Sequence, residues 1–331
     1  MTKNRRILVI SGGILLLLGL VLYVSPKPLE ALTDLFTDPL RTPFAFGNLM
    51  ASAGILTLSG AGIAVAMASG SFNLGGEGQA YLGSLLPVLL LLALPGAPPA
   101  LMIPLGLAAG AFGGSAMGWL SGIMREKIGT DELISSYLAA GAVIPIIDYL
   151  IAVPLRDPDS YLLSTPKIAE GFRLVRLLPP SQLTSGIFLA LGAALLWWFL
   201  SRYTLMGYEL RLSGANPRFA SLSGIRVSRY RSGGMSISGA LCGLAGALMS
   251  LGVYGAAVQG GTGGIGWNGI AVALIARYRP ALILPAALFF AYLTQGLSAA
   301  VMASGISNEM GLLLQAAVFI AITAGEAGKG E

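Results

Sequence analysis

The chain of 331 residues contains no histidine and only one cysteine, Cys242. Histidine and cysteine are the usual ligands of zinc, haem and iron–sulfur centres, and histidine is the commonest general acid–base side chain. The sequence therefore predicts no catalytic residue of that kind, no metal site and no cofactor. A single cysteine also excludes a disulfide within the chain.

A phosphate-binding loop is missing as well. The tail at 325–331 reads GEAGKGE, which has a Gly-Lys pair but lacks the spacing and the Ser or Thr of such a loop. Any ATP hydrolysis that this protein depends on must therefore come from another chain.

Charge is scarce, with 20 Lys and Arg and 15 Asp and Glu, whereas 55% of the residues are apolar. About 20 helical residues are needed to cross a membrane, and uncharged runs of about that length recur along the chain. They lie at 7–24, 47–72, 78–124, 133–147, 177–201, 232–276, 280–308 and 310–325.

Two of these runs contain breaks. The sequence PGAPP at 95–99 divides one run into two helices, and the glycine-rich stretch at 260–269 divides another into a full helix and a short one. The runs are continuous rather than alternating, which favours helices over a β-barrel. We therefore predict an all-α polytopic membrane protein with about ten transmembrane helices, forming one domain over 1–331.

The basic residues indicate the topology. With the N-terminus in the cytoplasm, most of the 20 Lys and Arg fall on the cytoplasmic side, as the positive-inside rule requires. Nucleic-acid binding is not needed to explain the positive charge. This topology predicts external loops at 25–46 and 155–184 and a cytoplasmic loop at 205–231. The carboxylates of the external loops are either solvated charge or a docking face for an external partner.

A weak internal repeat is visible. The tripeptide Ser-Gly-Ala occurs at 59–61 and at 238–240, and each copy is followed by a glycine-rich polar stretch, at 73–79 and 260–269. On the predicted topology the two copies run in opposite directions, which is how many transporters build a site near the bilayer midplane. The repeat-like units span about 47–154 and 232–325.

Glu77 lies between two glycines, beside Asn73 and Gln79. An unpaired carboxylate at membrane depth costs about 2.5 to 3.5 kcal/mol, so such a residue is a candidate for function. The alternative is that Glu77 caps the helix that opens at Gly78, because acidic side chains favour helix N-termini.

Trp267 and Asn268 close the second glycine-rich stretch and could stack on, and hydrogen-bond to, a planar solute. The alternative for the tryptophan is anchoring at the membrane interface. Two helix ends with a few uncharged polar side chains suit a neutral or weakly polar solute. The predicted solute pathway consists of Asn73, Glu77, Gln79, Gln259, Trp267 and Asn268.

The predicted cytoplasmic loop is polar and rich in arginine. Asn216 followed by Pro217 is a helix-start signal, and Gly224 is a stop signal. The helix predicted at 217–223 is too short to be stable in water by itself, so we expect it to dock onto something.

The sequence resembles the permease subunits of bacterial ABC importers of the branched-chain amino acid, ribose and simple-sugar type. The resemblance is closest to the branch that works with basic-membrane-protein-type lipoproteins and imports nucleosides. The matching stretches follow the family order: FNLGGEGQ at 72–79, GTDELISS at 129–136, GYELR at 207–211, GANP at 214–217, SGAL at 238–241 and WNGIAVAL at 267–274.

The resemblance implies that the short cytoplasmic helix docks into a groove of a separate ATP-binding subunit. Phe219 and Leu222 would supply apolar contact, and Arg218 a charged one. The remaining residues of the implied coupling segment are Gly207, Glu209, Arg211, Gly214, Asn216 and Pro217.

The resemblance also implies partners and a location. The expected partners are ATP-binding subunits, a second permease chain, homologous or identical, an external solute-binding lipoprotein and membrane lipid. The expected location is the bacterial inner membrane. Trp267-Asn268 stands where the family pattern has Phe-Asp, and Gly76 where it has a β-branched residue. Riboflavin or a simple sugar is therefore the alternative solute. The rival classes are a proton-coupled secondary transporter that uses Glu77 and a structural membrane scaffold.

Overall fold

A computed structural model describes residues 19, 27–304 and 316. Within these residues seven helices are long and apolar enough to cross a membrane, one apolar helix is shorter, and β-structure is limited to two isolated bridges. The prediction of an all-α polytopic membrane protein is confirmed. The predicted spans at 7–24 and 310–325 and the tail at 325–331 lie almost wholly outside the described residues.

The structure divides into two compact units. The described part of the first unit comprises 27–53 and 288–304, and the second unit comprises 54–287. The helices α3 and α12 each contribute to both units.

In the first unit, the segment predicted as an external loop at 25–46 contains the helix α2 (Pro28–Arg41). The loop prediction was wrong because proline stands at the first helical position, where it is tolerated, and Glu30 lies in the first turn. Ala31 and Leu35 pack against Leu297 and Ala300 of α12 (Ile283–Ser304). A hydrogen bond of 2.8 Å from Gln295 Nε2 to the carbonyl oxygen of Ala45 ties α12 to the start of α3.

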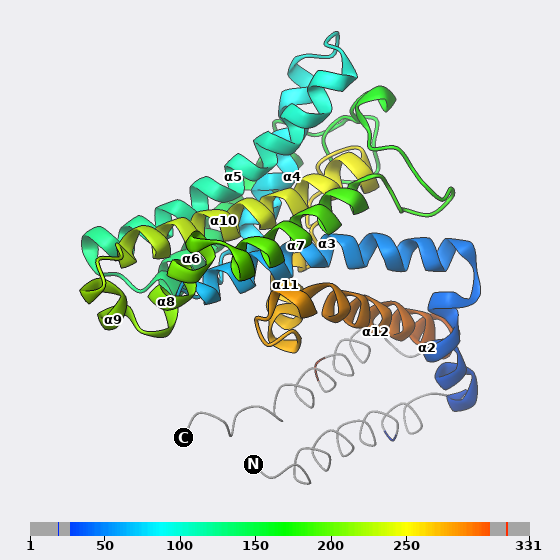
Figure 1. Cartoon of the computed structure of the whole chain (residues 1–331). Coiled ribbons are helices and arrows are strands. Elements are labelled where there is room, and N and C mark those ends of the chain that lie inside the picture. The colour runs from blue at the N-terminus through cyan, green and yellow to red at the C-terminus, as the bar shows by residue number, and fades with distance from the viewer. Residues whose placement is uncertain (1–18, 20–26, 305–315, 317–331) are drawn as a thin grey trace. The chain divides into compact units, whose positions relative to one another are not determined.

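The second unit is built around three helices that pack on one another (Figure 1). They are α4 (Gly76–Ala93), α5 (Pro99–Ile128) and α10 (Val227–Leu248). Around them lie the rest of α3 (Pro43–Ala68), α6 (Glu132–Ala152), α7 (Gly186–Tyr203) and α11 (Ile265–Ile275). The predicted break in the run 232–276 is confirmed. It begins with a π-helical turn at Met249–Tyr254 and continues to Gly264, which precedes α11.

Glycines bring α5 and α10 into backbone contact. An ideal Cβ atom on Gly114 would lie 2.0 Å from the carbonyl oxygen of Gly239, and one on Gly118 would lie 2.1 Å from that of Met235. These distances are shorter than any van der Waals contact, so only glycine fits. Membrane helices gain most of their association from such close packing of small residues.

The segment 155–184 is a loop, as predicted, apart from one 3-10 turn at Glu170–Phe172. It is bound to the chain that follows α10, since the Thr165 amide donates to Ala257 and the Leu174 amide donates to Leu251, at 2.9 and 3.1 Å. Phe172, in the 3-10 turn of this loop, is buried. The loop therefore closes one end of the second unit.

We expect Gly114→Ala to lower the thermal stability of the purified protein. The new methyl group meets a carbonyl oxygen that no side-chain rotation can move, and overpacking of this kind costs about 1 to 3 kcal/mol. Gly141→Ala in α6 is the matched control, because no atom lies within 4 Å of the methyl position there. Thermal unfolding in detergent measures both variants, and equal midpoints would contradict this account of the contact between α5 and α10.

Candidate functional site

Two helices begin within the two glycine-rich stretches, and these two beginnings touch. Gly76 is the first residue of α4, and Gly266 is the second residue of α11. An ideal Cβ on Gly266 would lie 2.0 Å from the amide nitrogen of Glu77 and 2.3 Å from the carbonyl carbon of Gly76. The two N-termini therefore meet backbone to backbone in the interior of the second unit.

Glu77 bridges the two helix starts. Its carboxylate accepts hydrogen bonds from the Thr262 hydroxyl at 2.6 Å, the Gly264 amide at 3.1 Å and the Gly266 amide at 2.8 Å. The side chain is 9% exposed. Glu77 does cap a helix, as the alternative interpretation held, but α4 begins at Gly76 rather than Gly78. The helix that Glu77 caps is α11, about 190 residues away in the sequence.

A network of amide side chains holds the first glycine-rich stretch. Asn73 Nδ2 donates to Gln79 Oε1 at 2.7 Å and to Ser238 Oγ at 2.9 Å. Asn73 Oδ1 accepts from the Gly75 amide at 2.9 Å and from Gln79 Nε2 at 3.1 Å. All three side chains are buried. Asn73 and Gln79 thus use their hydrogen-bonding groups to fix the chain between α3 and α4.

This network lies inside the helical bundle. Ser238 follows Arg231, the last charged residue of α10, by seven positions. At 1.5 Å per helical residue it lies about 10 Å further along the helix. The stretch 73–79 is therefore inside the bundle, away from its polar end.

Tyr81 belongs to the same site, although the sequence reasoning missed it. Its hydroxyl donates to Asp148 Oδ1 of α6 at 2.6 Å and accepts from the Gly260 amide at 3.0 Å. It is 1% exposed. The signal was available, because Tyr81 follows Glu77 by four positions and thus shares its face of α4.

The remaining pathway candidates lie elsewhere. Trp267 is 46% exposed on α11 and packs edge-on against Tyr137 of α6, with ring centroids 6.3 Å apart. Asn268 is half-buried beside it. Gln259 is tied through its backbone amide to the carbonyl of Leu163, at 2.9 Å. The structure thus brings Asn73, Glu77 and Gln79 together in the interior and leaves Trp267 on a surface.

The predicted short helix is confirmed as α9 (Pro217–Leu222), with the Asn216 side chain accepting a hydrogen bond from the Phe219 amide at 3.0 Å. Gly224 follows it at φ +82°, as the stop signal indicated. The interpretation of 205–231 as a loop was incomplete. A further helix, α8 (Leu205–Ala215), precedes α9 and contains Glu209 and Arg211.

The surface of α9 is apolar and accessible. Leu222 is 88% exposed and Phe219 is 54% exposed, and Arg218 is exposed next to Phe219. Side chains this apolar on so short a helix are typical of a docking surface.

Several contacts anchor α8 to the bundle. The Thr204 hydroxyl caps its first turn by accepting from the Gly207 amide at 3.1 Å. Arg211 Nη1 donates to Ser201 Oγ of α7 at 2.9 Å, and the Tyr230 hydroxyl of α10 donates to the Glu209 carboxylate. The helix α8 is therefore fastened to both α7 and α10.

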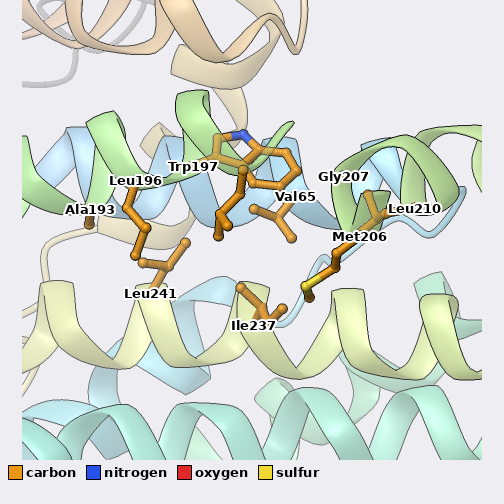
Figure 2. Close-up of a pocket in the computed structure, with 10 residues that line it drawn as sticks. Val65, Ala193, Leu196, Trp197, Met206, Gly207, Leu210, Ile237 and Leu241 are labelled. Carbon is orange, nitrogen blue, oxygen red and sulfur yellow. The ribbon is translucent and has the colours of Figure 1, made fainter. Parts of the chain in front are cut away.

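An apolar cavity of about 100 Å³ lies between α8, α7, α10 and the end of α3 (Figure 2). Its wall carries almost no polar surface, so it is unsuited to a polar solute. The lining residues are Val65, Ala193, Leu196, Trp197, Leu200, Met206, Gly207, Leu210, Ile237 and Leu241.

Comparison with known proteins identifies relatives over nearly the whole chain. The family described as branched-chain amino acid transport system / permease component matches residues 45–323. The probable riboflavin import permease protein RfuC of Treponema pallidum is 32% identical and covers 94% of this chain and 83% of its own. The nucleoside ABC transporter permease protein NupB of Lactococcus lactis is 31% identical, over 93% of this chain and 86% of its own. The guanosine ABC transporter permease protein NupP of Bacillus subtilis is 33% identical, over 76% of this chain and 73% of its own.

We expect Glu77→Gln to destabilise the second unit. The amide places an NH₂ group among three donors and removes the negative charge from between two helix N-termini, a loss of about 2 kcal/mol or more. The thermal midpoint in detergent should fall by several degrees. Glu126→Gln, at an exposed position of α5, is the control and should leave the midpoint unchanged. A midpoint equal to that of the wild type would show that Glu77 does not act as a cap.

Proposed function

Because the chain belongs to the permease component family of branched-chain amino acid transport systems, which are ABC importers, we propose that it translocates a nucleoside-like solute. The solute would be delivered by an external binding lipoprotein, and a separate ATP-binding subunit would drive the cycle. Two relatives named as nucleoside or guanosine permeases support this solute class.

The chemistry of the interior also supports a neutral solute. The side chains of the 73–79 stretch and of Ser238 are amides and a hydroxyl, and the carboxylate of Glu77 is occupied by three donors. The exposed face of Trp267 beside Tyr137 offers aromatic surface to a planar heterocycle. Riboflavin is the second candidate, favoured by the relative from Treponema pallidum, because it combines a planar ring system with an uncharged polyol chain.

The proposed topology places α9 and the N-terminus in the cytoplasm. Arg202, Arg218 and Arg226 at this end of the second unit agree with the positive-inside rule. The opposite end is closed by the loop 155–184, where Tyr161 and Leu162 are exposed and would face the binding lipoprotein. A second permease chain, identical or homologous, would complete the pathway.

A proton-coupled transporter is the rival interpretation, and the surroundings of Glu77 weigh against it. The three groups that face the carboxylate all donate, so both of its oxygens already act as hydrogen-bond acceptors. A proton-carrying site would need room for a donor hydrogen on the carboxyl group itself.

The decisive experiment is uptake by the complex that co-purifies with this chain from its native membrane, reconstituted in proteoliposomes. We expect uptake of radiolabelled guanosine, with riboflavin and glucose tested as competitors. Uptake should require ATP and persist when the proton gradient is collapsed. Uptake that needs the gradient and ignores ATP would establish the rival, and no flux of any of the three solutes would contradict the proposed solute classes.

We further expect Arg218→Glu to weaken docking of the ATP-binding subunit, because it reverses a charge beside Phe219 on the accessible face of α9. Retention of that subunit during purification and solute-stimulated ATP hydrolysis should both fall, by about tenfold. Arg202→Glu changes an exposed arginine of the same end of the second unit that lies on α7. If both variants lose the subunit equally, the effect is general charge and α9 is not the docking site.

A further inference from the structure

The helix α2 of the first unit leaves part of its apolar surface uncovered. One set of its apolar residues is buried and recurs every four positions, namely Ala31, Leu35 and Pro39. A second set, Leu29, Phe36 and Leu40, is 77%, 53% and 58% exposed. Spacings of seven and four residues place this second set along one face of the helix. These three residues therefore form a continuous surface, which we call the apolar stripe.

The polar residues of α2 occupy the opposite side. Each lies three or four positions from the next of its kind, and together they are Glu30, Thr33, Asp34, Thr37, Asp38 and Arg41. The helix is thus apolar along one half of its circumference and strongly polar along the other. Such amphipathic helices are typical of segments that lie in the plane of a membrane interface.

The rotation of α2 about its own axis is fixed by α12. Pro39 has no amide hydrogen, so the carbonyl group of Leu35 loses its usual donor within the helix. That carbonyl oxygen faces α12, where an ideal Cβ on Gly296 would lie 2.1 Å from it. The Tyr292 hydroxyl donates to the neighbouring carbonyl oxygen of Phe36. These backbone contacts hold Ala31 and Leu35 against α12 and keep the apolar stripe turned away from it.

The neighbouring helix indicates where α2 lies. The helix α3 is long and apolar enough to cross a membrane, so its first residue, Pro43, lies at one membrane surface. Only Thr42 separates it from α2, and the extended backbone at Thr42 lets the chain turn between α2 and the start of α3 (Figure 1). With three carboxylates in 14 residues, α2 cannot itself enter the hydrocarbon. It therefore lies along the surface from which α3 starts.

The exposed apolar surface continues from α2 into the first turn of α3, where Phe44 is 50% exposed. A transmembrane helix exposes such a side chain to lipid. Charge does not favour binding to anionic head groups, because Lys27 is paired with Glu30 at 2.9 Å and the carboxylates outnumber the basic residues. Contact between α2 and lipid therefore depends on apolar area.

We propose that α2 is an interfacial helix whose apolar stripe lies among the acyl chains of the adjacent lipid leaflet. Its polar side faces water, and through Gly296 and Tyr292 it holds α12 at the membrane surface. On the proposed topology this is the external surface of the membrane. The inference concerns a lipid contact and does not depend on the identity of the solute or on ATP.

Spin labelling of the full chain in vesicles of phosphatidylethanolamine and phosphatidylglycerol tests the proposal. Phe36→Cys places the label on the apolar stripe, and Thr37→Cys places it on the polar side at the next residue, which is also exposed. Cys242 is 0% exposed, so the label attaches to the introduced cysteine, and the unaltered protein gives the background. Collisions with oxygen report lipid, and collisions with a water-soluble nickel chelate report water.

We expect the label at position 36 to collide severalfold more with oxygen than with nickel, and the label at position 37 to show the reverse. The reason is that the apolar face of an interfacial helix lies about 5 to 10 Å into the boundary between head groups and acyl chains. If Phe36→Cys fails to fold, Leu40→Cys and its exposed neighbour Arg41→Cys give the same comparison.

Two other outcomes would overturn the proposal. A label that favours nickel at both positions shows that the apolar stripe lies in water. An immobilised label at position 36 that meets neither reagent shows that protein covers the stripe. Dilution with unlabelled protein then distinguishes a second copy, whose spin–spin broadening disappears, from a segment of the same chain such as 7–24 or 310–325. No transport is measured, so these results stand or fall separately from the proposed function.

Discussion

The interior of this protein depends on one carboxylate. Two helix N-termini, each equivalent to about half a positive charge, meet at Gly76 and Gly266, and in a membrane no water screens their repulsion. Glu77 lies between them and accepts the amides of α11 while belonging to the first turn of α4. Without a negative group there, this arrangement of α4 and α11 would be unfavourable, and the glycine-rich stretches would lose their shape.

In this fold glycine serves mainly to let the backbones of two segments approach each other closely. At Gly114 and Gly214 a single methyl group would collide with a carbonyl oxygen of another segment. Backbone contact of this kind leaves little tolerance for a change in helix separation. The helix α8 is joined in this way to α7 and to the end of α3, and it lies beside a cavity. Rigid attachment next to free space is what distinguishes it from the core formed by α4, α5 and α10.

The sequence was informative where structure is decided locally. Asn216-Pro217 and Gly224 defined α9 to within a residue, because capping acts over a few neighbours. The sequence was less informative about α8 and α2. The helix α8 contains Gly207 and Gly214, which serve as backbone contact points, and α2 begins at Pro28. The partner of Glu77 could not be predicted, since the bonded residues lie 185 to 189 positions away and no periodic pattern links them.

The charge distribution connects this architecture to the kind of solute it admits. Two carboxylates are buried in the described residues, Glu77 and Glu132. The first is neutralised by the helix N-termini and the Thr262 hydroxyl, and the second forms an ion pair with Arg125 across the turn between α5 and α6. A buried charge that is fully compensated attracts no counter-ion. The interior therefore offers dipoles rather than net charge, which agrees with the neutral solute proposed for this protein.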